Sequence, residues 1–250
     1  MGELQELQER RSFECRLTPD RALQTLDEAE AFLRDRGLLT RTTDSALPSL
    51  FDACHEEPYA PDRAGFGQWP RTKWWWSGAL LERNGIYGPK IHRGKTLYLT
   101  DQTAAIADPI CRSEIERMKA DDPGWALLLR HLGDAGPSSA EDLRTELELK
   151  PRELKAIRSP LERCGAVVSL RLAESRLARW DQVFPDTSVH GGIEDLIVAG
   201  VRAAVVAPER ELQRWFSWSW LVGPGLVERL VEDRRLARPE REWICLGERE

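Results

Sequence analysis

The hydrophobic residues that precede Gly37 recur at the spacing of one face of a helix. They are Leu23, Leu26, Ala29, Phe32 and Leu33. Thr18, Pro19 and Asp20 have the residue types of an N-cap, a first-turn proline and a first-turn acid, and glycine is common just past a helix end. The pattern predicts a helix from about Thr18 to Gly37, and we expect residues 1–17 before it to be a charged, frayed lead-in.

After Gly37 the hydrophobic residues form two shorter segments and then alternate with polar residues. Pro48 opens a short apolar segment, and the run WWWSGALLER at residues 74–83 predicts a third helix, which Asn84 and Gly85 end. A β-favouring run follows on either side of HRGK, where Gly94 permits a tight turn. This predicts a hairpin with strands near residues 86–91 and 95–100.

The order of helices followed by strands recurs twice more. Residues 125–136, 141–149 and 150–167 each have helical periodicity, and strands are predicted near 166–172 and 176–180. The last part of the chain has the helical runs IEDLIVAGVRAAV, PERELQRWFSW and GLVERLVEDRRLA, then a strand near 242–246. Three segments of similar plan indicate a tandem array, although no sequence repeat is detectable.

We therefore predict a mainly α chain with small β-hairpins, of the α+β class, built from three winged helix-turn-helix units. The expected divisions are a lead-in at 1–17, a first winged helix at 18–100, a linker helix at 101–122, a second winged helix at 123–187 and a third at 188–250.

Composition narrows the class of protein. The 250 residues are 41% hydrophobic and 31% charged, which suits a folded globular chain. No apolar run approaches the roughly 18 residues that span a bilayer, and the first residues lack the apolar centre of a signal peptide, so we expect a cytoplasmic protein without a membrane partner. The five cysteines and four histidines are scattered without ligand spacing. We expect buried thiols, no metal and no cofactor.

Charge is distributed unevenly. The net charge of −6 disfavours coating nucleic acid through an overall field, but six Lys or Arg residues lie between positions 71 and 95 against the single acid Glu82. A second basic cluster lies on the third helix of the second unit, the element that a helix-turn-helix protein places in the major groove. The candidate DNA-binding residues are Arg71, Lys73, Lys90, His92, Arg93, Lys95, Lys150, Arg152, Lys155 and Arg158. The alternative for the second cluster is a solvated face.

Three consecutive tryptophans, Trp74, Trp75 and Trp76, precede the first hairpin. Neighbouring residues of a helix point about 100° apart, so the three side chains cannot all enter one core. At least one must face outward or toward another unit. Either two fill the core while the third packs on the next helix, or one is available to stack on an unpaired base.

The segment RTKWWWSGALLERNGIYGPKIHRGKTLYLT, the later LERCGAVVSLRL and the three-unit order resemble bacterial tandem winged-helix proteins related to the DNA glycosylases that excise alkylated bases and unhook interstrand crosslinks. The resemblance covers the chain from about Thr18 onward. It implies a concave, basic DNA-binding surface shared by three winged helices. In the active members of that family it also implies hydrolysis of the N-glycosidic bond.

Those active members carry a Gln-hydrophobic-Asp or Gln-hydrophobic-Gln motif soon after the first helix. The corresponding segment here, RGLLTRTTDSALP, has no glutamine, and Asp44 is its only acid. The resemblance makes Asp44 the candidate catalytic residue; the alternative is a turn residue before Pro48. Gln182 and Asp186 also place a glutamine near an acid, but they do not match the motif.

We expect a monomer that binds double-stranded DNA, including damaged DNA, in DNA repair or damage recognition. One alternative is an active glycosylase acting on alkylated bases, and the other is a transcriptional regulator or protein-interaction module. A deep pocket beside Asp44 would favour the enzyme, a continuous basic channel the DNA-binding protein, and a large apolar surface patch a protein partner.

Overall fold

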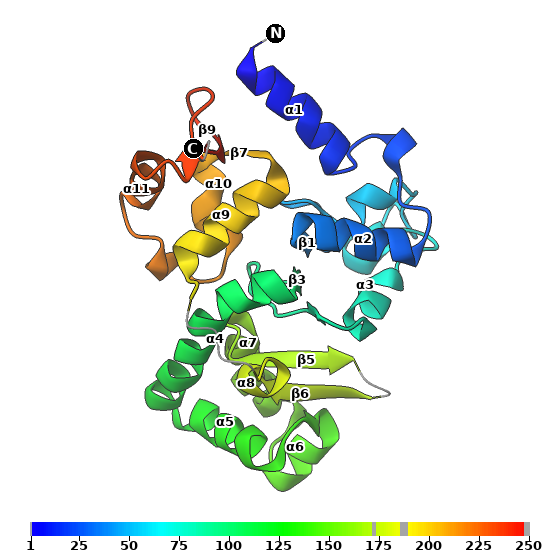
Figure 1. Cartoon of the computed structure of the whole chain (residues 1–250). Coiled ribbons are helices and arrows are strands. Elements are labelled where there is room, and N and C mark those ends of the chain that lie inside the picture. Colours follow the sequence, from blue (N-terminus) through cyan, green and yellow to red (C-terminus); the bar gives the residue numbers. More distant parts are fainter. Residues whose placement is uncertain (1, 172–173, 186–189, 248–250) are drawn as a thin grey trace.

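The structure is a computed structural model that describes residues 2–171, 174–185 and 190–247. It contains three small antiparallel sheets in a mixed helical and strand fold, which agrees with the α+β class (Figure 1). The sheets lie in three successive units, coloured blue to cyan, green, and gold to red in Figure 1.

Each sheet has three strands in the same order, with the last strand of the unit in the centre. The first sheet has β1 (Leu38–Thr40), β2 (Ile86–Tyr87) and β3 (Leu97–Thr100), in the order β1-β3-β2. The second has β4 (Ser138–Ser139), β5 (Val167–Arg171) and β6 (Ser175–Arg179), in the order β4-β6-β5. The third has β7 (Val206–Pro208), β8 (Leu236–Ala237) and β9 (Trp243–Leu246), in the order β7-β9-β8.

The helices occupy equivalent places in the three units, one before the first strand and others before the second. In the first unit they are α2 (Leu26–Arg36), α3 (Trp76–Ala79) and the 3-10 turns Pro19–Arg21, Asp52–Cys54, Gly65–Gln68 and Leu80–Glu82. In the second they are α5 (Pro123–Ala135), α6 (Ala140–Glu146), α7 (Pro151–Arg163) and, after the sheet, α8 (Trp180–Val183). In the third they are α9 (Ile193–Ala204), α10 (Glu209–Trp215), the 3-10 turn η5 (Ser219–Leu221) and α11 (Leu226–Glu232).

Helix α4 (Asp101–Asp121) coincides with the expected linker helix but is packed on several sides. Ala107, Ile110, Cys111 and Ile115 of α4 are buried in one hydrophobic cluster that also contains residues of all three sheets. The helix packs against β3, α5 and α9. It therefore fixes the three units against one another.

The register of the second hairpin agrees with the sequence. Strands expected near 166–172 and 176–180 are β5 and β6, which pair from Val167 with Arg179 to Arg171 with Ser175. The strand expected near 242–246 is β9. The strand prediction is thus confirmed in the second and third units to within two residues.

The first unit departs from the predicted elements at three places. The residues expected to be a frayed lead-in form helix α1 (Glu3–Glu14), because buried Leu4 packs against the third sheet and Arg11 donates to the carbonyl of Ala46 at 3.0 Å. The helix expected from Thr18 begins at Leu26, where Thr25 is the N-cap and accepts from the amide of Glu28 at 3.1 Å. Its expected end at Gly37 is confirmed, with φ of 80° there.

The third departure is the tryptophan-rich helix. Only Trp76–Ala79 is α-helical, and a 3-10 turn then ends before Gly85, which has φ of 70°. The hairpin strands are shorter than predicted, so that residues 88–96 form an extended loop between β2 and β3. Among the described residues, no helix has the length and apolar character to cross a membrane.

Candidate nucleic-acid interface

The loop between β2 and β3 contains the tight turn expected at HRGK. The amide of Lys95 donates to the carbonyl of His92 at 2.8 Å, while Arg93 and Gly94 have φ of 53° and 77°. The loop reaches the third unit, because buried Ile91 accepts from the amide of Ser217 at 2.8 Å. We call residues 88–96 the wing loop.

His92 is fully buried at the base of this turn. Its Nδ1 lies 2.6 Å from the carbonyl oxygen of Trp215, and its Nε2 lies 2.7 Å from a carboxylate oxygen of Asp44. His92 therefore joins Asp44 of the first unit to Trp215 of the third, and its side chain is buried in this contact.

Asp44 is the acceptor at the centre of this cluster. Its carboxylate accepts from Lys95 at 2.5 Å as well as from His92, and its backbone carbonyl accepts from Arg93 at 3.2 Å. Burial alone would raise the pKa of Asp44, but the hydrogen bonds from Lys95 and His92 outweigh it and hold that pKa below the ordinary value. The carboxylate is ionised, and its charge faces the Lys95 ammonium group and the His92 ring.

A hollow of about 370 Å³ lies next to this segment and is lined by Ser45 and Ala46. The acid that lines it is Glu211, which accepts from the amide of Ala46 at 2.6 Å. Asp44 lines none of the five hollows that we consider in the described part of the chain. The geometry thus places the candidate catalytic acid in an ion-pair cluster.

Lys90 is also held by an acid, across the boundary between the first and second units. Its Nζ lies 2.7 Å from Oε1 of Glu162, whose side chain is only 4% exposed. Ser169 donates to the same oxygen at 2.7 Å, and Arg158 lies 3.6 Å from Oε2. Lys90 and Arg158 therefore neutralise a buried glutamate, and both side chains are also partly exposed to solvent.

The basic pair Arg71 and Lys73 and the three tryptophans belong to the segment that leads into α3. Lys73 donates to the carbonyl of Leu23 at 2.7 Å, whereas Arg71 is exposed. Trp76 is buried, but Trp74 and Trp75 are 39% and 48% exposed. The expectation that at least one tryptophan faces outward is confirmed, and the interpretation that two of them fill the core is wrong.

Helix α7 presents the second basic cluster on its solvent side. Leu154 and Leu161 are buried, whereas Lys150, Arg152 and Lys155 are exposed. The amide of Lys150 at the N-cap donates to the side chain of Glu153 at 2.7 Å. This division follows from the amphipathic spacing of the helix.

Three adjoining hollows lie along α7, and we call them together the basic channel. The first, of about 420 Å³, meets the second, of about 330 Å³, at Ser159. The second meets the third, of about 430 Å³, at Arg163 and Ser217. The cations that line them are Lys90, Arg144, Lys155 and Arg158 in the first, Arg117 and Arg163 in the second, and Arg93 and Arg214 with Arg163 in the third.

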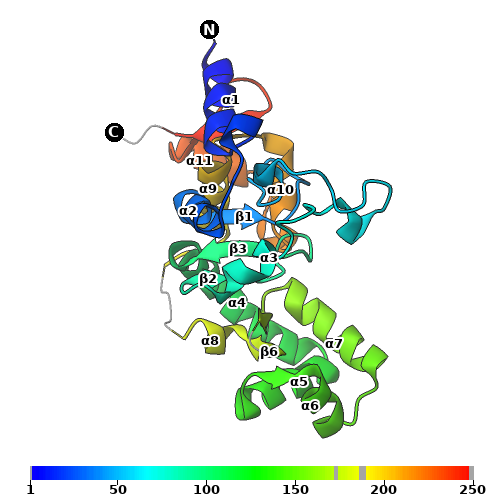
Figure 2. The same ribbon diagram turned by 90° about the vertical axis from the view of Figure 1, so that its right-hand side faces the viewer.

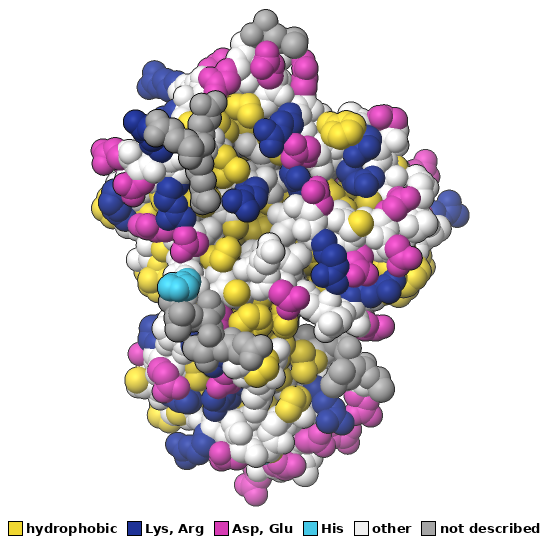
Figure 3. Space-filling model, viewed as in Figure 1, with side chains coloured by type: hydrophobic (Ala, Val, Ile, Leu, Met, Phe, Trp, Pro, Cys, Tyr) yellow, Lys and Arg dark blue, Asp and Glu magenta, His cyan; other side chains and the backbone are white. Residues whose placement is uncertain are grey.

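The basic channel is positively charged although the whole chain is negative. Among the described residues only two acids line it, Glu162 and Asp121, and each is paired, with Lys90 and Arg117 respectively at 2.7 Å. Figure 2 shows α7 on one side of the molecule, with the loop that precedes α3 projecting on the same side. On the face drawn in Figure 3, by contrast, cations and anions are interspersed.

Sequence reasoning did not select Arg144, Arg117, Arg163 or Arg214, which the fold brings to this channel from α6, α4, α7 and α10. Arg163 lies within the second basic cluster in the sequence, so the count of cations there was a usable signal. Arg214 had none, because its own helix also contains the acids Glu209 and Glu211 and so has no excess of cations. Its place depends on contacts between units.

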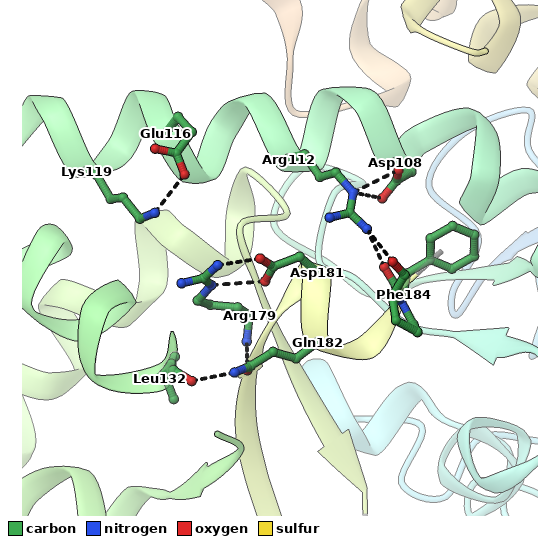
Figure 4. Close-up of polar contacts among 10 residues, drawn as sticks. Asp108, Arg112, Glu116, Lys119, Leu132, Arg179, Asp181, Gln182 and Phe184 are labelled. Atoms are coloured by element: carbon green, nitrogen blue, oxygen red, sulfur yellow. Dashed lines mark hydrogen bonds and ion pairs between the residues drawn. The ribbon is translucent and has the colours of Figure 1, made fainter. Parts of the chain in front are cut away.

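The second glutamine considered from the sequence serves the fold. Gln182 accepts from the amide of Arg179 at 3.1 Å and donates to the carbonyl of Leu132 at 2.6 Å (Figure 4). In the same view Arg179 pairs with Asp181, and Arg112 donates to Asp108 at 2.8 Å. Asp186 lies outside the described residues. Both ends of the Gln182 amide are therefore already bonded within the second unit.

All five cysteines are buried, free thiols, as expected from the sequence. Burial raises the pKa of Cys15 to about 11 and those of Cys54 and Cys164 to about 12, so these thiols are not nucleophilic near neutral pH. The described residues contain no group of three or more His, Cys, Asp or Glu side chains that could hold a metal ion.

A scan against protein-family models gave no match, and searches of curated proteins and of solved structures found no significant similarity to this chain.

Proposed function

We propose that this chain is a double-stranded-DNA-binding protein of three tandem winged helices that acts in DNA repair or damage recognition in the cytoplasm. The repeated order of helix, strand, two helical elements and two strands, with the last strand central, is what a winged helix requires. In that plan α7 takes the place of the recognition helix of the second unit.

The observation that supports binding is the basic channel along α7. Eight lysine and arginine residues line it against two acids, each of which is ion-paired. Phosphate contacts from Lys and Arg supply most of the affinity of proteins for DNA, and they fix the protein on the duplex without reading sequence. A local channel of this kind provides those contacts despite a net charge of −6.

The contacts of the wing loop refine which candidates would reach DNA. Lys95 and His92 are engaged by Asp44, and Lys90 is engaged by Glu162. Arg93 lines the third hollow of the channel. We therefore assign the phosphate contacts to Arg93 and to the cations around α7, chiefly Arg144, Lys155, Arg163 and Arg214.

Binding is favoured over base excision because Asp44 is neutralised. A carboxylate that stabilises an oxocarbenium ion must present its charge to the sugar, and Asp44 presents it to Lys95 and His92. The position that would hold the family's catalytic glutamine has none. Asp44 instead joins the first unit to the third through His92.

The test is the salt dependence of DNA affinity in the variant Arg144→Ala/Lys155→Ala. Both residues are exposed and without an ion pair in the described part of the chain, so the fold should persist. Each lost phosphate contact lowers the slope of log K against log salt concentration by about 0.9 for B-DNA. We expect a slope lower by about two units and weaker binding to any duplex sequence.

The matched control is Arg202→Ala, which removes an exposed arginine from α9, away from the channel. It should leave both the affinity and the slope unchanged. If the double variant binds duplex DNA with the same affinity and slope as the original protein, α7 does not face DNA and the proposal fails.

A further inference from the structure

Two hollows of the basic channel differ in chemistry although they share Arg163 and Ser217. The hollow of about 430 Å³ beside the wing loop is lined mainly by arginine and polar side chains. The hollow of about 330 Å³ contains Trp125, Trp220 and other apolar residues. Each volume lies in the range of about 300–1,000 Å³ that is typical of small-molecule sites. We call the two hollows together the junction site.

The cationic half of the junction site holds three arginines, one from each unit: Arg93, Arg163 and Arg214. None of them has a carboxylate partner among the described residues, whereas Arg112 and Arg117 of α4 are both ion-paired. Arg93 is fixed in place, because its Nε donates to the carbonyl of Arg214 at 2.7 Å. Three adjacent guanidinium groups without an acid form a natural site for phosphate.

Glycine at position 94 brings two of these arginines together. Gly94 has φ of 77°, and a Cβ built there would lie only 3.2 Å from Nε of Arg163. The backbone of the wing loop therefore packs closely against the Arg163 side chain. Cations that belong to the first and second units are held next to one another by this contact.

The apolar half of the junction site is walled by two tryptophans. Trp125 is half-buried, but Trp220 on η5 is 55% exposed, an unusual state for a large aromatic side chain that lines a hollow. The guanidinium carbon of Arg117 lies 5.3 Å from the centre of the Trp220 ring and helps to hold it. Exposed aromatic rings of this kind are the platforms on which unpaired bases stack.

Ser217 lies between the two halves and lines both. Its amide is fixed by the carbonyl of Ile91, but its hydroxyl oxygen is buried and has no hydrogen-bond partner in the described part of the chain. Buried polar groups are nearly always paired in native proteins. The unsatisfied hydroxyl therefore indicates a polar ligand at the boundary between the cationic and the apolar half.

We propose that the junction site binds a single unpaired nucleotide, with its phosphate on Arg93, Arg163 and Arg214 and its base against Trp220 and Trp125. The adjoining halves match the two ends of a nucleoside monophosphate, and Ser217 lies where the sugar would sit. The nucleotide is either part of a DNA strand or free in solution. If the nucleotide is part of a DNA strand, the proposal rests on the DNA-binding function proposed above.

The experiment compares two labelled duplexes by fluorescence anisotropy, one fully paired and one with a single bulged nucleotide, and measures free dAMP by calorimetry. A site that takes a strand-borne nucleotide should bind the bulged duplex about 10-fold more tightly than the paired one, within the range expected for stacking one base. Trp220→Ala should abolish this ratio, and Arg214→Ala should reduce it. Trp75→Ala is the matched control, since Trp75 is also about half exposed but lies in the first unit, and it should leave the ratio unchanged.

The duplex comparison and the dAMP measurement together distinguish a nucleotide within a DNA strand from a free one. Binding of dAMP that weakens at least 5-fold in both Trp220→Ala and Arg214→Ala, with equal affinity for the two duplexes, identifies a free mononucleotide. A bulge preference lost in Trp220→Ala identifies a strand-borne one. The proposal is overturned if dAMP does not bind and the bulge gives no advantage, or if the advantage survives Trp220→Ala or disappears in Trp75→Ala.

Affinity for the fully paired duplex tests the DNA-binding function separately. A protein that binds dAMP through Trp220 and Arg214 but binds no duplex retains the junction site and loses the function proposed above. Thermal unfolding of each variant shows whether it is folded, which is expected because Trp220 and Arg214 are both exposed.

Discussion

At the scale of single residues, Asp44 and His92 form a polar contact that joins the first unit to the third. His92 is buried, and its ring contacts the Asp44 carboxylate through Nε2 and the Trp215 carbonyl through Nδ1. Removing the Asp44 carboxylate takes away the acceptor that faces Nε2 of His92, and a buried polar group left unsatisfied is costly. We therefore expect the main contribution of Asp44 to be to the stability of the fold.

We predict that Asp44→Asn lowers the free energy of unfolding by about 1–3 kcal/mol, the range for leaving a buried hydrogen-bonding group unsatisfied. Urea denaturation measures this change. The control is Asp62→Asn, in an exposed position without an ion pair among the described residues, which should be nearly neutral. An Asp44→Asn protein as stable as the original would mean that the cluster is not structural.

The difference in stability between the original protein and Asp44→Asn should depend on pH in one direction. Because the folded-state pKa of Asp44 lies below its ordinary value of 3.8, the unfolded state binds the proton more readily. The contribution of Asp44 is present above that ordinary value and is lost as pH falls through the lower, folded-state pKa. The stability gap between the original protein and Asp44→Asn should therefore narrow in this acid range, and a gap that widens there would contradict it.

The residue types of this cluster could be selected from the sequence, but their partnership could not. Asp44 was considered for catalysis, and His92 and Lys95 for DNA contact, because acids and bases stand out from a local pattern. His92 and Lys95 lie 48 and 51 positions from Asp44, and only the packing of the wing loop brings them together. Long-range ion pairs leave no periodic signal in a sequence.

At the scale of elements, the sequence predicts best where the pattern is long. Helix α7 and the strands β5 and β6 have clear spacing over several residues, and they are found where they are expected. The first strand of each unit was not predicted, because β1, β4 and β7 have only two or three residues. Strands this short exist only through pairing with the central strand.

Gly165, between α7 and β5, shows how one turn connects the elements of three units. It has φ of 82°, and an added Cβ would lie 2.8 Å from Cys111 on α4, 3.0 Å from Ile91 on the wing loop and 3.3 Å from Trp218 in the third unit. All three neighbours are buried. A side chain here would separate α4, the wing loop and the third unit.

We predict that Gly165→Ala destabilises the protein by about 2–5 kcal/mol, since overpacking typically costs about 1–3 kcal/mol and left-handed backbone strain about 1–2 kcal/mol. The control is Gly225→Ala, where φ is 79° but the nearest atom is the end of the Arg229 side chain at 3.9 Å. That variant should lose only the stability that left-handed backbone strain costs. Equal losses in the two variants would show that Gly165 is not a packing contact between units.

At the scale of the whole molecule, three units of one plan have become a single packed body. The main hydrophobic cluster contains buried residues of all three sheets together with α4, and ion pairs at Glu162 and Asp44 cross the same boundaries. The three-unit order was visible in the sequence as repeated runs of helices and strands. The contacts that create the basic channel and the junction site were not, since they join residues of different units.

This arrangement has a consequence for unfolding, because no unit can lose its structure without exposing the α4 surface that the others cover. We predict one cooperative urea transition, with tryptophan fluorescence and far-UV circular dichroism coinciding. The buried tryptophans Trp76, Trp180 and Trp215 report on the first, second and third units respectively. Ile115→Ala in the buried face of α4 should lower the stability by about 2–5 kcal/mol and shift both probes together. Separate transitions, or a shift confined to one probe, would show instead that α4 joins three units that fold independently.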